Sequence, residues 1–237
     1  MGGALSGMFL RRFLPDHHLG ADAKDVVRLG SGLIGTIAAL VLGLLIASAK
    51  SSFDTQSSQV KQMAASIILL DQHLALYGPD ANTPRQLMRN EIGALADRIW
   101  QQGRAPKAEP FEFGSGAMAI YVALEKLEPK TEAQRLLQAR SIQIITDLAQ
   151  TRLLLFEQAI TPIPMPFLVV LIFWLVIIFA SFSLFSEPTP FVIGALLLFA
   201  LSAAGAIFLI LEMSQPFTGM MQIPRATLSN ALPPLSP

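Results

Sequence analysis

The sequence contains no cysteine, only three histidines and, at 14% of its residues, few charged side chains. The absence of cysteine excludes disulfides, thiolate metal sites and a cysteine nucleophile. The 17 basic and 17 acidic residues cancel, so no overall field favours nucleic acid or another polyanion as a partner. Soluble domains usually carry about a quarter charged residues. The deficit of charge therefore favours a membrane protein.

Recognisable catalytic patterns are also missing, since the chain has no P-loop, GxGxxG, GxSxG or HExxH motif. His17 and His18 are adjacent in a polar connector, but no third metal ligand lies near them in the sequence. Carboxylate pairs such as Glu109 and Glu112 have no convergent partners and are interpreted as solvated. The sequence therefore predicts no catalytic residue, no metal site and no cofactor, and it argues against an enzyme.

Long apolar segments are what the chain does contain. Residues 29–49 hold no ionisable side chain, and a helix of that length covers about 30 Å, the thickness of the hydrocarbon core of a bilayer. Residues 167–185 and 191–211 are a second and a third such segment, separated by the short turn SEPTP. These segments predict an all-α, polytopic membrane protein with a membrane helix at 29–50 and a membrane hairpin at 162–212.

The polar block between the first and second spans is predicted to be a helical bundle outside the membrane, at residues 51–161. No helix-breaking residue follows Lys50 before Gly78, so the first membrane helix is expected to continue to Tyr77. Apolar residues spaced by three and four give this extension a packing seam, which consists of Val60, Met63, Ile67, Leu70, Leu74 and Tyr77. Polar residues off the seam are expected to face water; they are Ser57, Lys61, Gln62 and Asp71.

Three more helices are predicted in the bundle. The first starts at an N-cap, Thr83, which is followed by Pro84. A shorter helix covers residues 117–127. The last begins at the capping box of Thr131 and Gln134 and runs to about residue 160. Residues 213–237 form a tail, whose proline-rich end is expected to be loosely ordered.

Small residues recur at every fourth position of the first membrane helix; they are Gly35, Ala39, Gly43 and Ala47. Such a stripe lets two helix backbones approach closely in lipid, where packing drives association. We interpret these residues as candidates for a helix contact or for the lining of a pore. The alternative is that glycine and alanine are simply common in membrane helices.

Glu212 directly follows the third apolar segment. An acid at the mouth of an uncharged span is either an interfacial residue in water or part of an ion path. The turn Gln215-Pro216-Phe217 comes next, and its proline cannot continue the hydrogen bonding of a helix, so the third span is expected to end within one turn.

Three stretches together resemble the bestrophin-like domain family, a group of mostly uncharacterised bacterial and plant membrane proteins. They are FLRRFLPDHHLGADAKDVVRLGSGLIGTIAALVLGLLIASAKSSFD, VLIFWLVIIFASFSLF and AGAIFLILEMSQPFTGMMQI. The resemblance implies two spans, a helical block, two spans and a tail. Family members usually carry a further apolar helix before the FLRR segment. Residues 1–28 are therefore interpreted as a remnant of that helix and a polar connector: either the start codon is misassigned or this member has lost a span.

True bestrophins are pentameric anion channels, so the resemblance implies a homo-oligomeric ion channel, with anions as the candidate substrate and residues 29–49 near the pore. A second hypothesis is a non-conducting scaffold or sensor that binds a partner through its helical bundle. Either would be a multi-pass protein of the bacterial inner or plasma membrane, with the lipid bilayer and not nucleic acid as its partner. Basic residues near the spans divide evenly between the two sides and leave the orientation open; the resemblance places the bundle in the cytoplasm.

Overall fold

The computed structural model describes residues 2, 21–102, 115–160, 165–186 and 189–231, and within these ranges it contains helices, turns and no strand. The chain divides into two compact units. The first, here called the membrane unit, comprises Met1–Ser51 and Pro162–Ser214; the second, here called the bundle, comprises Ser52–Thr161 and Gln215–Pro237. The all-α fold predicted from the sequence is confirmed.

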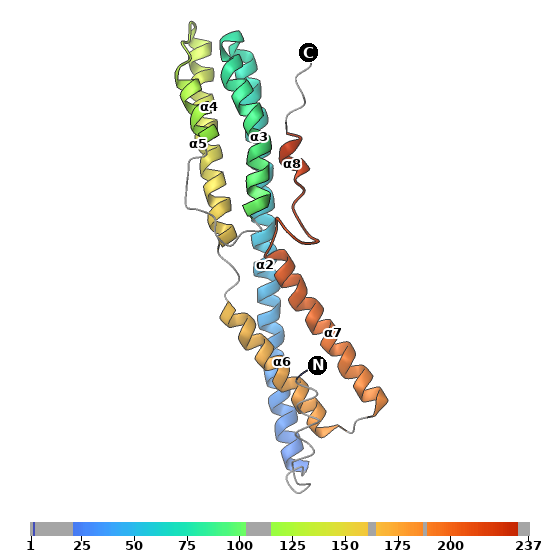
Figure 1. The fold of residues 1–237 in the computed structure, drawn as a ribbon. Helices are drawn as coiled ribbons and strands as arrows, with labels where there is room; N and C mark the ends of the chain where they lie inside the picture. The colour runs from blue at the N-terminus through green and yellow to red at the C-terminus, as the bar shows by residue number, and fades with distance from the viewer. Residues whose placement is uncertain (1, 3–20, 103–114, 161–164, 187–188, 232–237) are drawn as a thin grey trace. The chain divides into compact units, whose positions relative to one another are not determined.

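Helix α2 spans Ala21–Tyr77 and contributes to both units (Figure 1). It is continuous because neither glycine nor proline occurs between Gly43 and Gly78. It ends where Gly78 adopts a φ of 109°, a conformation that side chains with a Cβ rarely tolerate. The predicted helix from the first span to Tyr77 is confirmed.

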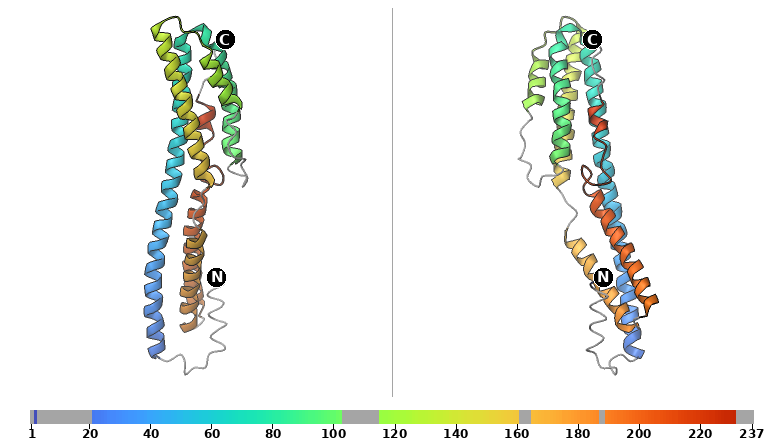
Figure 2. Two further views of the ribbon diagram at one scale, coloured as in Figure 1. Left: turned by 90° about the vertical axis from the view of Figure 1, so that its left-hand side faces the viewer. Right: turned by 45° about the vertical axis from the view of Figure 1, so that its right-hand side comes forward.

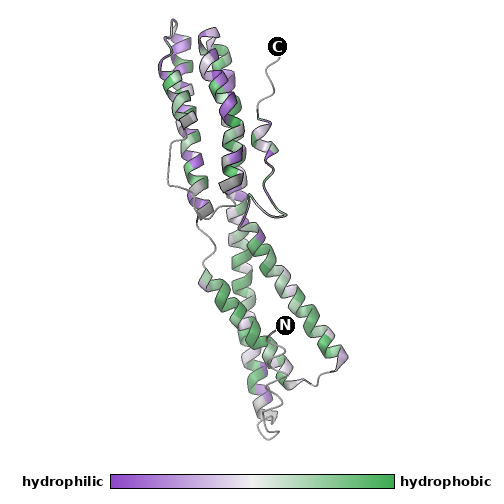
Figure 3. Cartoon of the chain, in the orientation of Figure 1, coloured by the Kyte–Doolittle hydropathy of each residue, from purple (hydrophilic) through white to green (hydrophobic). Residues whose placement is uncertain are grey.

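The membrane unit contains the first part of α2 together with α6 (Met165–Phe185) and α7 (Pro190–Met213). Figure 3 shows α6 and α7 as hydrophobic over most of their length. Within the described residues, three helices are long and apolar enough to cross a membrane, in the places that the sequence predicts. Thr189 begins α7 by accepting a hydrogen bond from the backbone N–H of Val192 at 3.4 Å, with Pro190 in the first turn.

The bundle contains the rest of α2, the 3₁₀ turn η2 (Pro79–Ala81), α3 (Asn82–Gln102), α4 (Ser115–Glu125), α5 (Glu132–Ile160) and α8 (Ala226–Ser229). Figure 2 shows α3 and α5 running antiparallel to α2. Every residue of the predicted α2 seam is at most 3% exposed, so the seam is confirmed. The predicted N-cap is wrong by two residues, because α3 begins at Asn82, directly after η2, and Thr83 lies inside the helix.

Two glutamines of α5 join the bundle helices by their amide groups. The backbone N–H of Gln134 donates to Thr131 Oγ1 at 3.1 Å, as the capping box predicts, and its Nε2 donates to the carbonyl oxygen of Tyr77 at 3.1 Å. Gln138 Nε2 donates to the carbonyl oxygens of Leu124 and Leu127 at 2.8 and 2.9 Å. The end of α2 and the end of α4 thus obtain side-chain donors for carbonyls near a helix C-terminus.

Candidate functional site

The small-residue stripe of α2 faces outward from the membrane unit. Ala39, Gly43 and Ala47 are exposed, and Gly35 is half-buried. A Cβ added to Gly35 would meet Ile178 Cδ1 of α6 at 3.9 Å, whereas one added to Gly43 would meet nothing within 4 Å. Within one chain the stripe is therefore largely unused for packing, and its place in a contact between chains or beside a pore stays a prediction.

A different face of α2 packs inside the membrane unit. Its buried residues are Ser31, Ala38, Leu45 and Ala49. Their spacing of seven, seven and four is that of a narrow seam along a helix. Sequence reasoning did not find this seam, because every face of a membrane span is apolar and hydrophobicity does not tell the inward face from the outward one.

Glu212 lies in the last turn of α7 and is half-buried. The helix is closed by Ser214, whose backbone N–H donates to the carbonyl oxygen of Ile210 at 3.2 Å and whose Oγ donates to that of Leu211 at 2.6 Å. Helix α7 ends at Met213, within one turn of Pro216 as expected. In the part of the chain that the structure describes, no group of three or more acidic, histidine or cysteine residues could hold a metal ion. A role for Glu212 in an ion path stays a prediction.

The predicted turn Gln215-Pro216-Phe217 opens a folded segment that we call the C-terminal strap, residues 215–231. The carbonyl oxygen of Gln215 accepts from the N–H of Thr218 at 3.1 Å, and that of Pro216 accepts from the N–H of Ile223 at 2.8 Å. These bonds close a loop that includes Gly219, which has a φ of 87°. The strap is thus an ordered part of the bundle; the proline-rich end, residues 232–237, lies outside the described residues.

Aromatic and ionic contacts attach the strap to α3. Phe217 is 6% exposed and packs edge-on against Trp100, with 5.4 Å between ring centroids and 75° between ring planes. Trp100 Nε1 donates to the carbonyl oxygen of Ile223 at 3.0 Å, and Arg225 pairs with Asp97. Phe217 therefore acts in packing. Sequence reasoning placed residues 213–237 in a separate tail, because a loop with scattered apolar residues has no periodicity that would reveal its burial.

Asp71 forms a polar cluster with two arginines of α3. Arg85 donates Nε and Nη2 to its two carboxylate oxygens at 2.8 and 2.9 Å, and Arg89 does the same at 3.0 and 2.8 Å. Hydrogen bonding from Arg85 is the main cause that lowers the pKa of Asp71 to about 2, while burial opposes this shift. The cluster joins α2 to α3 with a net charge of one positive unit.

The expectation that Asp71 faces water is wrong, since the residue is 7% exposed. Its position off the seam is real, but the side chain is covered by the two arginines of α3. A signal for the pair was present: a tight turn at Gly78 makes α2 and α3 a hairpin, and the arginines stand about as far after the turn as Asp71 stands before it. Both arginines also share one helix face, being four residues apart.

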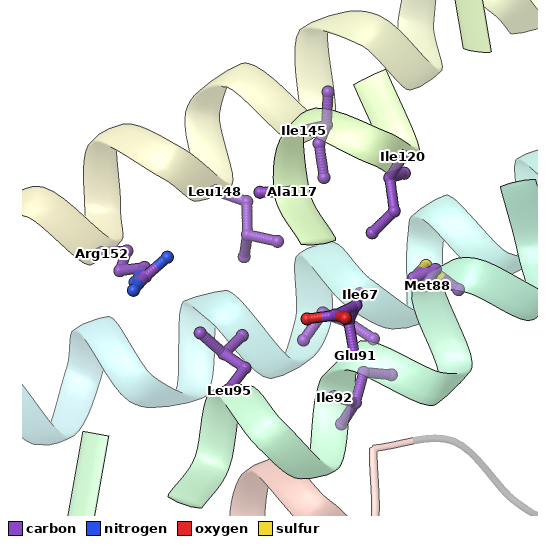
Figure 4. A pocket seen from close by; sticks show the side chains of 10 residues that line it. All are labelled: Ile67, Met88, Glu91, Ile92, Leu95, Ala117, Ile120, Ile145, Leu148 and Arg152. Atoms are coloured by element: carbon purple, nitrogen blue, oxygen red, sulfur yellow. The ribbon is translucent and has the colours of Figure 1, made fainter. Parts of the chain in front are cut away.

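A cavity of about 50 Å³ lies between α2, α3, α4 and α5 (Figure 4). Most of its wall is apolar, and the charged residues that reach it are Glu91 of α3 and Arg152 of α5. Pockets that hold drug-sized ligands measure roughly 300–1,000 Å³ and bring several polar groups together. This cavity is far smaller, so we interpret it as a gap in the core and not as a substrate site.

Comparisons of the sequence and of the fold with known proteins both lead to bestrophins. The model of the bestrophin-like domain matches residues 1–228, and no curated protein matches the sequence at a significant level. Two crystal structures of point variants of a bacterial bestrophin homologue from Klebsiella pneumoniae share the fold at 13% sequence identity. One has a TM-score of 0.65 and an alignment covering 96% of this chain and 94% of that one; the other has a TM-score of 0.64, covering 85% and 83%. The family match extends over nearly the whole sequence, and the chain is thus a membrane protein of the bestrophin-like family.

Proposed function

We propose that this protein assembles into a homo-oligomeric ion channel of the bacterial inner or plasma membrane, with α2 near the pore and anions as the candidate substrate. Membership of the bestrophin-like family supports this proposal, since true bestrophins are pentameric anion channels. The observation that carries it is the outward-facing stripe of Ala39, Gly43 and Ala47 on α2. By the same analogy, we propose that the bundle lies in the cytoplasm.

The surface around the stripe has the shape that a second helix requires. Leu40 and Leu44 lie beside it and are 64% and 63% exposed. Small residues next to a row of leucines form a groove next to a ridge, and two copies of such a surface can interlock. In lipid, close packing of backbones is a main source of helix association, so the groove favours another copy of α2 over acyl chains.

The test is Gly43→Leu with Gly30→Leu as its matched control. Both glycines are exposed on α2, and a Cβ at either would meet nothing within 4 Å in the same chain. Gly43 lies on the stripe, whereas Gly30 lies about 140° away from it around the helix. We expect Gly43→Leu to reduce the oligomer mass in mild detergent and the chloride flux in liposomes, while Gly30→Leu preserves both. A wild-type monomer in several mild detergents, or equal behaviour of the two variants, would contradict the proposal.

The second candidate function is a non-conducting scaffold or sensor. Its support is a group of large apolar side chains that the bundle leaves exposed, among them Leu76 at 73%, Leu136 at 62% and Leu154 at 52%. Exposed apolar residues outside a membrane segment often mark protein contacts. Flux separates the candidates: an intact oligomer that passes no ion in liposomes would favour the scaffold.

A further inference from the structure

The bundle contains three glutamines whose side-chain oxygen atoms are buried and have no hydrogen-bond donor. These atoms are Oε1 of Gln56 and Gln59 on α2 and Oε1 of Gln158 on α5, and none has a partner within the described residues. Gln56 is 3% exposed. Buried polar groups in native proteins are nearly always paired with protein, water or an ion, so three unpaired oxygens of one kind require an explanation.

The three residues lie at the same end of the bundle. Figure 2 shows α2 and α5 running in opposite directions. Two contacts fix their register: Gln134 Nε2 donates to the carbonyl oxygen of Tyr77 at 3.1 Å, and Ile67 lines the same cavity as Leu148. From either contact, we count the same number of residues back along α2 and forward along α5, because both helices rise equally per residue. The count that reaches Gln56 on α2 reaches the last turns of α5, where Gln158 lies. Gln59 is one turn from Gln56 on α2.

The local electrostatics favour a positive ligand at these oxygens. Gln158 lies in the last turn of α5, a helix of 29 residues that has no basic residue in that turn. The carbonyl end of a helix carries a partial negative charge and attracts cations. Gln56 Nε2 donates to Ser52 Oγ at 3.4 Å, and its Oε1 remains without a donor.

We propose that Gln56, Gln59 and Gln158 form a binding site for a monovalent cation, Na⁺ or K⁺. Neutral carbonyl oxygens are ligands that alkali cations accept in place of their hydration shell. The site lies within the bundle, next in sequence to the places where the chain crosses between the bundle and the membrane unit, at Ser52 and Thr161. A bound cation would join α2 to α5 there.

The experiment measures thermal unfolding of the full chain in detergent, in NaCl, KCl and choline chloride of equal ionic strength. A ligand that binds only the folded state raises the Tm, and we expect an increase of at least about 2 °C in the NaCl or the KCl arm relative to choline. The larger increase identifies the preferred ion. The readout is stability and not flux, so its failure would leave the channel proposal untouched.

Four variants localise the effect. Gln56→Met and Gln158→Met replace an amide whose oxygen is unpaired by an apolar group of similar size, so both should fold and should lose the dependence on ion identity. Gln150→Met is the control, because Gln150 is exposed on the same helix; it should keep the wild-type increase. Gln158→Glu adds a charged ligand and should enlarge the increase in Tm. A wild-type Tm that is equal in all three salts, or an increase that persists in both variants at Gln56 and Gln158, would overturn the proposal.

Discussion

Replacing Asp71 by asparagine tests the ion-pair cluster that joins α2 to α3. The substitution keeps the shape of the side chain but removes the charge that faces Arg85 and Arg89, whose side chains are 23% and 14% exposed. Two guanidinium groups would then lie together without the carboxylate that they share. Removing one partner of a buried pair is costly because the remaining charge stays desolvated.

The pKa of Asp71 gives the size of the stability loss expected from Asp71→Asn. Its fall from 3.8 to about 2 in the folded protein corresponds to about 2 kcal/mol of stabilisation at neutral pH. The partial exposure of the arginines admits solvent screening, so about 2 kcal/mol is an upper figure. A loss of this size would lower the Tm by roughly 4–8 °C in a protein of this length.

The same shift predicts how stability depends on pH. The folded carboxyl group has a lower pKa than the unfolded one, so its contribution is complete above a pH of about 4 and is lost as the pH falls towards about 2. Asp71→Asn lacks this contribution at every pH. The difference in Tm between wild type and variant should therefore shrink over that interval.

The measurement is thermal unfolding of the full chain in detergent, monitored by circular dichroism at neutral and at acidic pH. Asp80→Asn is the matched control, because it breaks an ion pair with Lys130 in which the two side chains are 49% and 74% exposed; solvent screens such a pair, and little change in Tm is expected. If Asp71→Asn melted at the wild-type temperature at neutral pH, or if its difference from wild type did not depend on pH, the reasoning would be refuted.

The remaining predictions concern the strap and the end of α7. Phe217→Ala should reduce the free energy of unfolding by about 3 kcal/mol, since it leaves a gap beside Trp100. Thermal unfolding measures this loss, and Met220→Ala is the control because Met220 is 85% exposed. Equal losses in both variants would contradict a packing role for Phe217 in the strap. If the protein is a channel, Glu212→Gln should change conductance or ion selectivity in liposomes with little loss of folded protein, because a carboxylate at the negative end of a helix needs a compensating partner such as a basic side chain, a hydrogen bond or a passing cation. Equal flux and selectivity in mutant and wild type would make Glu212 an ordinary interfacial residue.

Local patterns in the sequence predicted much of the fold. The three apolar segments, the seam from Val60 to Tyr77 and the capping box at Thr131 each depend on residues within a few turns of one another. Helical periodicity and capping follow from the geometry of a single helix, so they can be read without knowledge of the rest of the chain. The family resemblance then supplied the type of membrane protein, and the match over residues 1–228 confirms it.

The sequence alone determined the helices, their order and the apolar face of α2 within the bundle. The tertiary structure decided which residues from distant segments meet: Asp71 with the two arginines of α3, and Phe217 with Trp100. It also decided that α2 packs on Ala38 and Leu45 within its unit and leaves Ala39 and Gly43 exposed. The physical reason is that helix formation depends on near neighbours, whereas the burial of a charge, an aromatic ring or one side of an all-apolar span depends on what another part of the chain places against it.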